Sequence, residues 1–239
     1  MKRYKIAGCV VDYTPMYSLL QDKMERYLLE EETEQAADIS LKLTEEFLRE
    51  KQKQNPHLTI AECEYVWAGL QFYRKLLNYQ GFMLHASAIE VDGKAYLFSA
   101  DSGVGKSTHA KLWQKFFGEE RAEILNDDKP AVVIEDECCF AYGTPFSGKS
   151  PEHLNRKARI QGICMLERGE ENRIWRVSGK EALPLLMRQV IWPRNREEAD
   201  KLLGYLQVVL KQVPLYRMEC NLSVEAAQKA YEMMKEEIV

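Results

Sequence analysis

Apolar residues recur at helical spacing in the segment that follows Thr59. Thr59 and Glu62 form a capping box, in which the hydroxyl and the carboxylate each satisfy a free backbone N–H group. Behind this start the chain repeats large apolar side chains on one helical face, and Gly81 offers a stop. These side chains are Val66, Trp67, Leu70, Tyr73, Leu76 and Leu77. The pattern predicts a long core helix. A shorter, more polar helix is expected at 44–54.

Two apolar runs, residues 82–91 and 94–99, flank the dipeptide Asp92-Gly93. Asp-Gly is favoured where both turn residues need a positive φ, so the pattern predicts an antiparallel hairpin. A glycine-rich segment follows directly, and residues 107–117 then have the pattern of a helix that Gly118 ends. The hairpin therefore leads straight into a loop and a helix.

The remaining pattern alternates between strands and helices. Residues 30–34 form an acidic stretch, which is expected to be solvated. Residues 181–190 are expected to form a helix whose start Pro184 delays. Asn195 and Ser223 are each expected to cap a further helix. Strands are predicted at 4–12, 123–125, 131–135, 138–142, 159–167 and 215–220. The fold class is α/β or α+β, with an antiparallel-rich mixed sheet flanked by helices.

Composition narrows the possible functions. The 239 residues are 46% hydrophobic and carry a net charge of −4, so we expect no nucleic-acid partner and no membrane partner. No apolar stretch approaches the ~20 residues that span a bilayer, and Asp12 interrupts the apolar run at the N-terminus. The six cysteines show no zinc spacing and are typical of a reducing compartment. The sequence thus predicts a soluble, cytoplasmic protein.

The segment Ala100–Thr108 carries the strongest chemical signal. It reads Ala-Asp-Ser-Gly-Val-Gly-Lys-Ser-Thr, between a strand and a helix. The Walker A pattern is G-x-x-x-x-G-K-[ST], and only its first glycine is replaced, by Ala100. The predicted nucleotide-binding residues are Ser102, Gly103, Val104, Gly105, Lys106, Ser107 and Thr108. A glycine-rich turn without function is the alternative.

These residue types suit the phosphates of a nucleoside triphosphate such as ATP. Glycines let successive N–H groups turn inward, and the helix that follows presents its free N–H groups and its positive dipole end. Lys106 is expected to reach the β- and γ-phosphate oxygens, and the hydroxyl of Ser107 to ligate Mg²⁺. The sequence therefore predicts a site for ATP with Mg²⁺.

Asp127 and Asp128 follow a short apolar strand and Asn126. A triphosphate site needs an acidic residue near the metal, so one aspartate is expected to be linked to Mg²⁺ and the other to accept a proton from an attacking hydroxyl. An Asx turn is the alternative, since Asn and Asp favour turns. His85 stands alone in an apolar strand, which is typical of a packed core residue. His109 is expected to point out of its helix.

Together these motifs resemble the catalytic core of HPr kinase/phosphorylase. The resemblance rests on Leu84–Ile89, the Asp-Gly hairpin, the glycine loop and Asn126–Asp128, and it covers residues 82–150 best. It is closer to the short HPr-kinase-like proteins, which include the lasso-peptide kinases. The resemblance implies a P-loop fold of the phosphoenolpyruvate carboxykinase type, in which an antiparallel strand pair precedes the loop.

The resemblance also implies roles for individual residues. His85, Asp127 and Asp128 would be catalytic, and Ser107 and Asp128 would be linked to the metal. Lys149, in a loop similar to one in the short proteins, would contact phosphate; a surface lysine is the alternative. Thr108 stands where the bacterial enzymes usually carry Glu, and their second glycine-rich signature is missing. These departures weaken HPr itself as the substrate.

We therefore expect residues 81–239 to form a kinase-like core, with residues 1–80 packed against it as a strand-and-helix region. The predicted activity is an ATP-dependent phosphotransferase that acts on a hydroxyl of a peptide, a small protein or a small molecule. A regulatory nucleotide-binding protein and a peptide-maturation accessory protein, neither of which transfers phosphate, are the alternatives. The choice between ATP and GTP and the existence of a homo-oligomer stay open.

Overall fold

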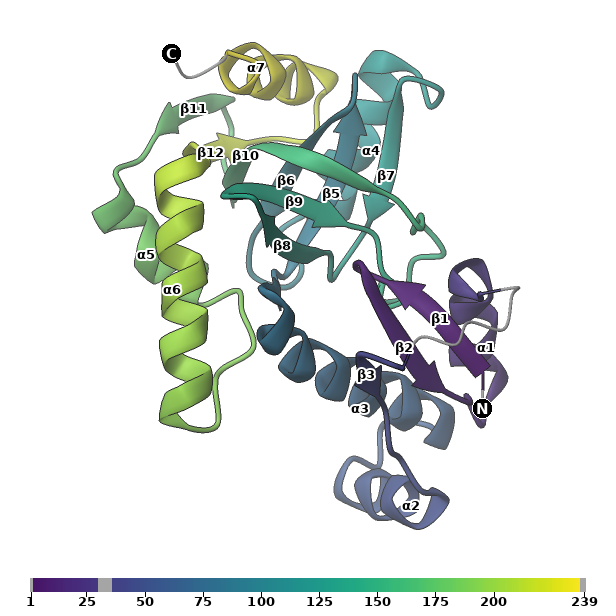
Figure 1. Cartoon of the computed structure of the whole chain (residues 1–239). Coiled ribbons are helices and arrows are strands. Elements are labelled where there is room, and N and C mark those ends of the chain that lie inside the picture. The colour runs from purple at the N-terminus through teal and green to yellow at the C-terminus, as the bar shows by residue number, and fades with distance from the viewer. Residues whose placement is uncertain (1, 30–35, 237–239) are drawn as a thin grey trace.

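Two β-sheets organise the chain, and helices lie against them (Figure 1). The computed structural model describes residues 2–29 and 36–236, so the acidic stretch 30–34 lies outside the described residues. The small sheet has the order β1-β2-β3, and the large curled sheet has the order β4-β8-β9-β10-β6-β5-β7, with β12 beside β10 and β11 beside β12. The strands are β1 Lys2–Ile6, β2 Cys9–Tyr13, β3 Ile39–Ser40, β4 Gly81–Met83, β5 Ala86–Val91, β6 Lys94–Ser99, β7 Ala122–Asn126, β8 Ala131–Glu135, β9 Cys138–Tyr142, β10 Lys157–Arg168, β11 Arg173–Arg176 and β12 Leu215–Cys220. The fold is thus a mixed α/β fold.

The large sheet is buried on both faces. Along β6, Ala95 and Leu97 belong to a cluster with residues of α5 and α6, whereas Tyr96 and Phe98 belong to a cluster with residues of α4 and α7. Because successive side chains of a strand point to opposite faces, a strand that is buried on both faces is expected to be apolar at every position. The four helices are α4 Lys106–Phe117, α5 Gly179–Met187, α6 Arg196–Gln212 and α7 Val224–Met234.

The strand directions bring four chain segments to one edge of the sheet. β5 is antiparallel to both β6 and β7, so β6 and β7 run the same way. β10 is parallel to β6, and β12 is parallel to β10. All four of these strands therefore end at the same edge, where β5 begins. This edge holds the glycine loop, the two aspartates and His85.

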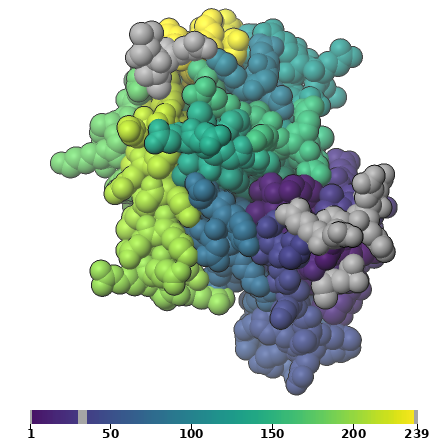
Figure 2. Space-filling model, in the orientation of Figure 1, coloured from purple at the N-terminus to yellow at the C-terminus, as the bar shows by residue number. Residues whose placement is uncertain are grey.

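The described part of the N-terminal region, residues 2–29 and 36–80, packs against the large sheet through a shared apolar cluster. The cluster joins side chains of β1, β2 and α3 (Ile60–Leu76) to Ala131, Val133 and Phe146. Inside it, the buried carboxylate of Glu64 accepts a hydrogen bond from the hydroxyl of Tyr13. Figure 2 shows this purple and blue region against the teal core, with α2 (Glu45–Gln54) at its outer end. The apolar packing is continuous across the predicted boundary at residue 80.

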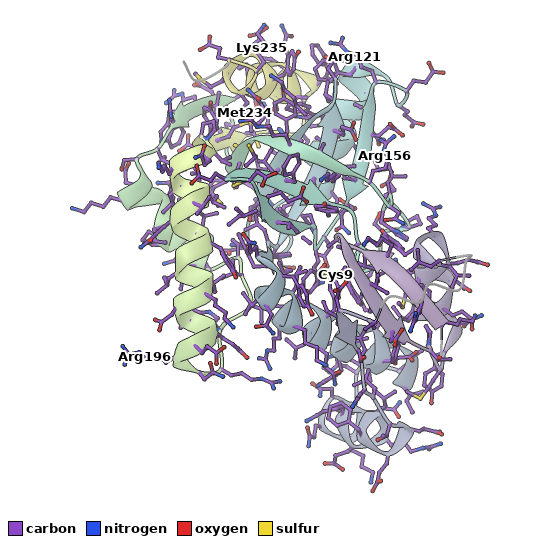
Figure 3. The ribbon with its side chains drawn as sticks, in the orientation of Figure 1. Cys9, Arg121, Arg156, Arg196, Met234 and Lys235 are labelled. Atoms are coloured by element: carbon purple, nitrogen blue, oxygen red, sulfur yellow. The ribbon has the colours of Figure 1, made fainter. Side chains whose placement is uncertain are left out.

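Ion pairs on the surface also join segments of the large sheet. Arg156, labelled in Figure 3, donates to Glu90 on β5 at 3.1 Å and to Glu123 on β7 at 2.6 Å. All three side chains keep contact with solvent, so the pairs add little to stability.

Several local predictions are confirmed. The capping box of Thr59 and Glu62 begins α3, and Thr44 caps α2. Asp92 and Gly93 both have a positive φ in the turn between β5 and β6. Asn195 caps α6 through its side chain. The prediction that Ser223 caps a helix is wrong: Ser223 precedes α7 without a capping bond, and its hydroxyl accepts from the amide of Asn172.

Other local predictions are wrong. The strand expected at 4–12 is a hairpin, because Ala7 and Gly8 adopt positive φ and reverse the chain. The run 82–91 divides into β4 and β5, which pair with different strands, and Gln80 rather than Gly81 takes the left-handed position after α3. The helix expected at 181–190 starts earlier, at Gly179, and includes Pro184.

Two further findings concern the cysteines and the lengths of the helices. All six cysteines are free. Within residues 2–29 and 36–236, no helix is both long enough and apolar enough to cross a membrane.

Candidate active site

The glycine loop runs from the end of β6 into the first turn of α4. Gly103 and Gly105 have φ values of +81° and +127°, a region that side chains with a Cβ rarely adopt. Gly105 is the residue at the N-terminal cap of α4, so the free N–H groups of that helix open toward the loop. Ser102, Gly103, Ser107 and Thr108 are exposed, and Val104 and Gly105 are half-buried. The predicted binding residues thus form one continuous, accessible loop.

Lys106 folds back over this loop. Its ammonium donates to the carbonyl of Ala100 at 3.0 Å, and the residue is only 8% exposed. Burial lowers the pKa of Lys106, although the charges of Asp128, Asp101 and Asp127 act in the opposite direction. The ammonium is therefore held among carboxylates at the mouth of the loop.

Asp127 lies beneath the loop, at the end of β7. One carboxylate oxygen accepts from the hydroxyl of Ser87 on β5 at 2.8 Å. Burial raises the pKa of Asp127, while nearby hydroxyls act in the opposite direction. These hydroxyls belong to Ser87, Ser107 and Ser150. The carboxylate of Asp127 therefore lies within reach of Ser107, the predicted metal ligand.

Asp128 has a partner on each carboxylate oxygen. Nε2 of His85 lies 3.3 Å from its Oδ1, and the ammonium of Lys129 pairs with its Oδ2. Burial would raise the pKa of Asp128, but the hydrogen bonds and charges of His85 and Lys129 lower it to about 2. Asp128 is therefore ionised at neutral pH.

A network behind the acid pair fixes its position. The side-chain oxygen of Asn126 accepts from the N–H groups of Asp128 at 3.0 Å and Lys129 at 2.7 Å, which is an Asx turn. The amide of Asn126 donates to the carbonyl of Thr144 at 2.9 Å, and the hydroxyl of Tyr73 on α3 lies 2.8 Å from that of Thr144. The Asx turn, which was the alternative to a functional role, is therefore present, and it holds the backbone that carries the two carboxylates.

The N-terminal region also reaches this site. Lys23 of α1 (Ser18–Met24) donates to the hydroxyl of Ser147 and to the carbonyl of Ser150, each at 2.8 Å. Burial lowers the pKa of Lys23, and the charge of Asp128 opposes this effect. A Cβ added to Gly148 would lie 2.8 Å from Oδ2 of Asp128, so only glycine fits beside this carboxylate. Through Lys23, the N-terminal region thus reaches the surroundings of the acid pair.

Lys149 does not join this cluster by any contact that the structure gives. Its side chain is exposed near the start of α3, where the hydrogen bonds of Thr59 lower the pKa of Glu62 and the charge of Lys149 adds to this effect. Phosphate contact by Lys149 stays a prediction.

Three residues of the site are absent from the residues that the sequence predicted. Ser87 is a buried polar side chain in an apolar strand, and its position in such a strand could have pointed to it. Arg168, at the end of β10, donates to the carbonyl of Gly103 at 2.5 Å. Gln189 contacts two residues at the site. Its Oε1 lies 3.1 Å from Nδ1 of His85, and its Nε2 donates to Asp101 at 3.3 Å. The last two lie far from the motif in sequence and reach it only through the fold.

The prediction for His109 is wrong. Its side chain points into the protein, is 2% exposed, and lies 4.5 Å from the ring of Phe98 on β6. Burial lowers the pKa of His109 to about 4. The helical face that carries His109 turns toward the sheet, because Ala110 and Trp113 on that side also pack there.

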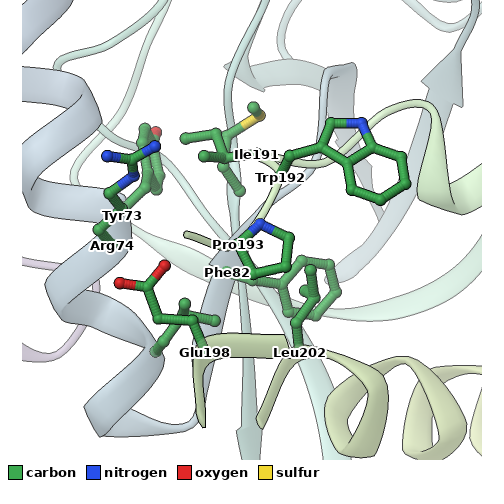
Figure 4. Close-up of a pocket in the computed structure, with 10 residues that line it drawn as sticks. Tyr73, Arg74, Phe82, Ile191, Trp192, Pro193, Glu198 and Leu202 are labelled. Atoms are coloured by element: carbon green, nitrogen blue, oxygen red, sulfur yellow. The ribbon is translucent and has the colours of Figure 1, made fainter. Parts of the chain in front are cut away.

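A small hollow lies beside the network behind the acid pair. Figure 4 shows Arg74 of α3 and Trp192 on opposite sides of it, with Phe82 and Pro193 between them. Trp192 is 64% exposed, whereas Nε and Nη1 of Arg74 are buried and have no hydrogen-bond partner among the described residues. Tyr73, which also lines this hollow, connects it to the backbone of Lys129.

The oxygen groups at the edge of the sheet suit Mg²⁺. Mg²⁺ in proteins takes one or two protein oxygens and completes its shell with phosphate oxygens and water. Ser107 and Asp127 offer such oxygens next to the loop, and Asp128 offers its own only through water or by releasing His85 or Lys129. Among the described residues no group of three or more His, Cys, Asp or Glu could hold a metal by itself. The residues therefore fit a metal that arrives with phosphates.

Comparison with known proteins gives a distant likeness. No protein-family model and no curated protein matches the sequence. Among solved structures, the Hpr(Ser) kinase/phosphatase from Coxiella burnetii aligns with a TM-score of 0.38 and 9% identity, over 64% of this chain and 99% of that chain. A likeness of this size does not place the chain in that family.

Proposed function

We propose that this protein is an ATP-dependent phosphotransferase that transfers the γ-phosphoryl group to a hydroxyl. The observation that carries the proposal is the position of Asp127 and Asp128 at the mouth of a glycine loop, facing the ammonium of Lys106. A turn of no function does not require one buried and one half-buried carboxylate there, because burying a carboxylate costs free energy unless partners compensate it.

The loop and Lys106 bind the phosphates. Backbone N–H groups of the loop and of the first turn of α4 donate to phosphate oxygens, and Lys106 leaves the carbonyl of Ala100 to pair with the β- and γ-phosphates. Mg²⁺, held by Ser107 and the phosphates, would neutralise charge on the transferred group. The exposed guanidinium of Arg168, already at the loop, adds a further positive charge.

The two aspartates divide the remaining work. A carboxylate with a raised pKa is the better proton acceptor, so Asp127 takes the proton of the acceptor hydroxyl. Asp128, with a pKa of about 2, stays charged and holds His85 and Lys129 in place. In this division Asp128 does not bind the metal directly, because both of its oxygens already have partners.

The acceptor is a hydroxyl of a peptide, a small protein or a small molecule. The proposal is tested by incubating the protein with Mg²⁺ and ATP labelled on the γ-phosphate, together with serine- and threonine-containing peptides and small alcohols. We expect label in at least one acceptor with wild type, and transfer that is about 100- to 10,000-fold slower with Asp127→Asn. Nucleotide binding without transfer to any acceptor, and without slow hydrolysis, would instead identify a regulatory nucleotide-binding protein.

A further inference from the structure

The segment of chain that ends in His153 runs beside the end of β7, where the acid pair begins. His153 pairs with Asn126 in an isolated antiparallel bridge. In an antiparallel pair the residues before one partner lie opposite the residues after the other, so the residues before His153 pass alongside Asp127 and Asp128. Gly148 of the same segment fits closely against the carboxylate of Asp128. The acid pair is therefore flanked by residues 148–152.

Ser150 is held firmly in this segment. Its carbonyl accepts from the ammonium of Lys23 at 2.8 Å and from the hydroxyl of Ser147 at 2.7 Å. Its hydroxyl oxygen accepts from the N–H group of Glu152 at 3.1 Å and donates to Oε2 of Glu152 at 3.3 Å. Ser150 is half-buried and belongs to no helix or strand. Its hydroxyl thus has a defined position beside the acid pair.

The hydroxyl of Ser150 is one of three that act on the carboxylate of Asp127. Burial raises the pKa of Asp127, and these hydroxyls, of Ser87, Ser107 and Ser150, act in the opposite direction. Ser87 is fully buried within β5, and Ser107 is the predicted ligand of Mg²⁺. Of the three, Ser150 alone is partly accessible and has no other role. Asp127 lies between its hydroxyl and the predicted metal ligand.

Cations beside Ser150 suit a phosphoryl group. The ammonium of Lys23 is bonded to the carbonyl of Ser150, and Lys111 of α4 pairs with Glu152. The second pair neutralises the carboxylate that accepts from the hydroxyl of Ser150. A phosphorylated serine carries a charge of about −1.5 to −2 at neutral pH, which such cations stabilise.

We propose that Ser150 is a phosphate acceptor, which the chain phosphorylates in cis from a nucleoside triphosphate bound at the glycine loop. The inference rests on the proposed function, since the same base serves both reactions. Oγ of Ser150 attacks the γ-phosphorus, the bond from this phosphorus to the β–γ bridging oxygen breaks, and the nucleoside diphosphate leaves with the electron pair. The proton of the hydroxyl passes to Asp127. An acceptor that the fold already holds avoids the entropy cost of bringing in a separate molecule.

The experiment incubates the full chain, first treated with a phosphatase, with Mg²⁺ and ATP labelled on the γ-phosphate and with no added acceptor. Tandem mass spectrometry locates the phosphate. We expect it on Ser150, at a first-order rate that does not depend on protein concentration. Ser150→Ala should remove the label, and Asp127→Asn should slow labelling by about 100- to 10,000-fold. Ser40→Ala, at a half-buried serine of β3, is the matched control and should be labelled as wild type is.

A mixing experiment tests whether the transfer occurs in cis. Chains with Lys106→Ala keep Ser150, and active chains with Ser150→Ala lack it, so neither should be labelled when the two are mixed. Label on the Lys106→Ala chains, or on a residue of wild type other than Ser150, would overturn the inference.

Two further outcomes separate this inference from the proposed function. Transfer of phosphate to added peptides or alcohols by a wild-type chain that stays unlabelled would overturn the inference, while the proposed function stands. A chain that transfers phosphate neither to itself nor to any added acceptor would overturn the proposed function, and this inference with it.

Discussion

Nε2 of His85 lies 3.3 Å from Oδ1 of Asp128, although the two residues stand on either side of the hairpin, the loop and α4 in sequence. The other ring nitrogen of His85 lies 3.1 Å from Oε1 of Gln189. Both neighbours are acceptors, since the amide of Gln189 already donates to Asp101. His85 thus links the acid pair to the start of the glycine loop.

The close fit of Gly148 against Asp128 predicts a loss of activity on substitution. In Gly148→Ala the new methyl group would meet Oδ2 of Asp128 and displace the carboxylate. Gly93→Ala is the matched control, because Gly93 also has a positive φ but has open space around it. Both variants should lose about 1 kcal/mol of stability from backbone strain. Only Gly148→Ala should lower phosphoryl transfer; equal activity of the two variants would contradict the geometry.

Lys106→Ala should weaken the binding of MgATP. The variant removes the ammonium that folds back from α4 over the mouth of the loop, so we expect at least about a tenfold rise in Kd, or about 1.4 kcal/mol. Lys115→Ala, on the exposed face of the same helix, is the control. Calorimetric titration measures both. Unchanged affinity in Lys106→Ala would refute phosphate binding at this loop.

Asp127→Asn should separate binding from chemistry. The amide keeps the size of the side chain but cannot accept the proton, so transfer should fall by about 100- to 10,000-fold. The Kd for MgATP should change much less. Asp136→Asn, at an exposed turn residue whose positive φ suits asparagine, is the control. Initial rates with labelled ATP provide the measurement, and a transfer rate close to that of wild type would assign the proton to another group.

The buried histidines predict a fall in stability with acid. Burial lowers the pKa of His109 and of His153 to about 4 from an ordinary value of 6.5. Between these values the unfolded chain binds protons that the folded chain does not, so the free energy of unfolding decreases as pH falls. The slope is at most about 1.4 kcal/mol per pH unit for each histidine.

This dependence is measured by urea unfolding at pH 7 and pH 5. His109→Gln and His153→Gln should each show a smaller loss of stability between the two conditions than wild type does. His57→Gln, at an exposed position, should match wild type. If all three variants lose as much stability as wild type, the two histidines are not the source of the effect.

The sequence by itself determined the local elements whose signals are short-range. Thr59 and Glu62 cap α3 because the capping box needs only four residues, and Asp92-Gly93 turns the chain because the dipeptide tolerates positive φ. The strand, glycine loop and helix at 94–117 follow for the same reason. The same signals singled out Lys106, Ser107, Asp127 and Asp128 as candidate site residues, whose roles stay predictions.

Only the tertiary structure decided which distant residues surround these candidates. Lys23, Ser87, Arg168 and Gln189 meet at one edge because β6, β7 and β10 run the same way while β5 runs against two of them. Strand order and direction depend on pairing between segments far apart in the chain, which no local pattern records. His109 is the clearest case: helical spacing gave its position on α4, but the packing of Phe98 and Trp113 decided that it faces inward.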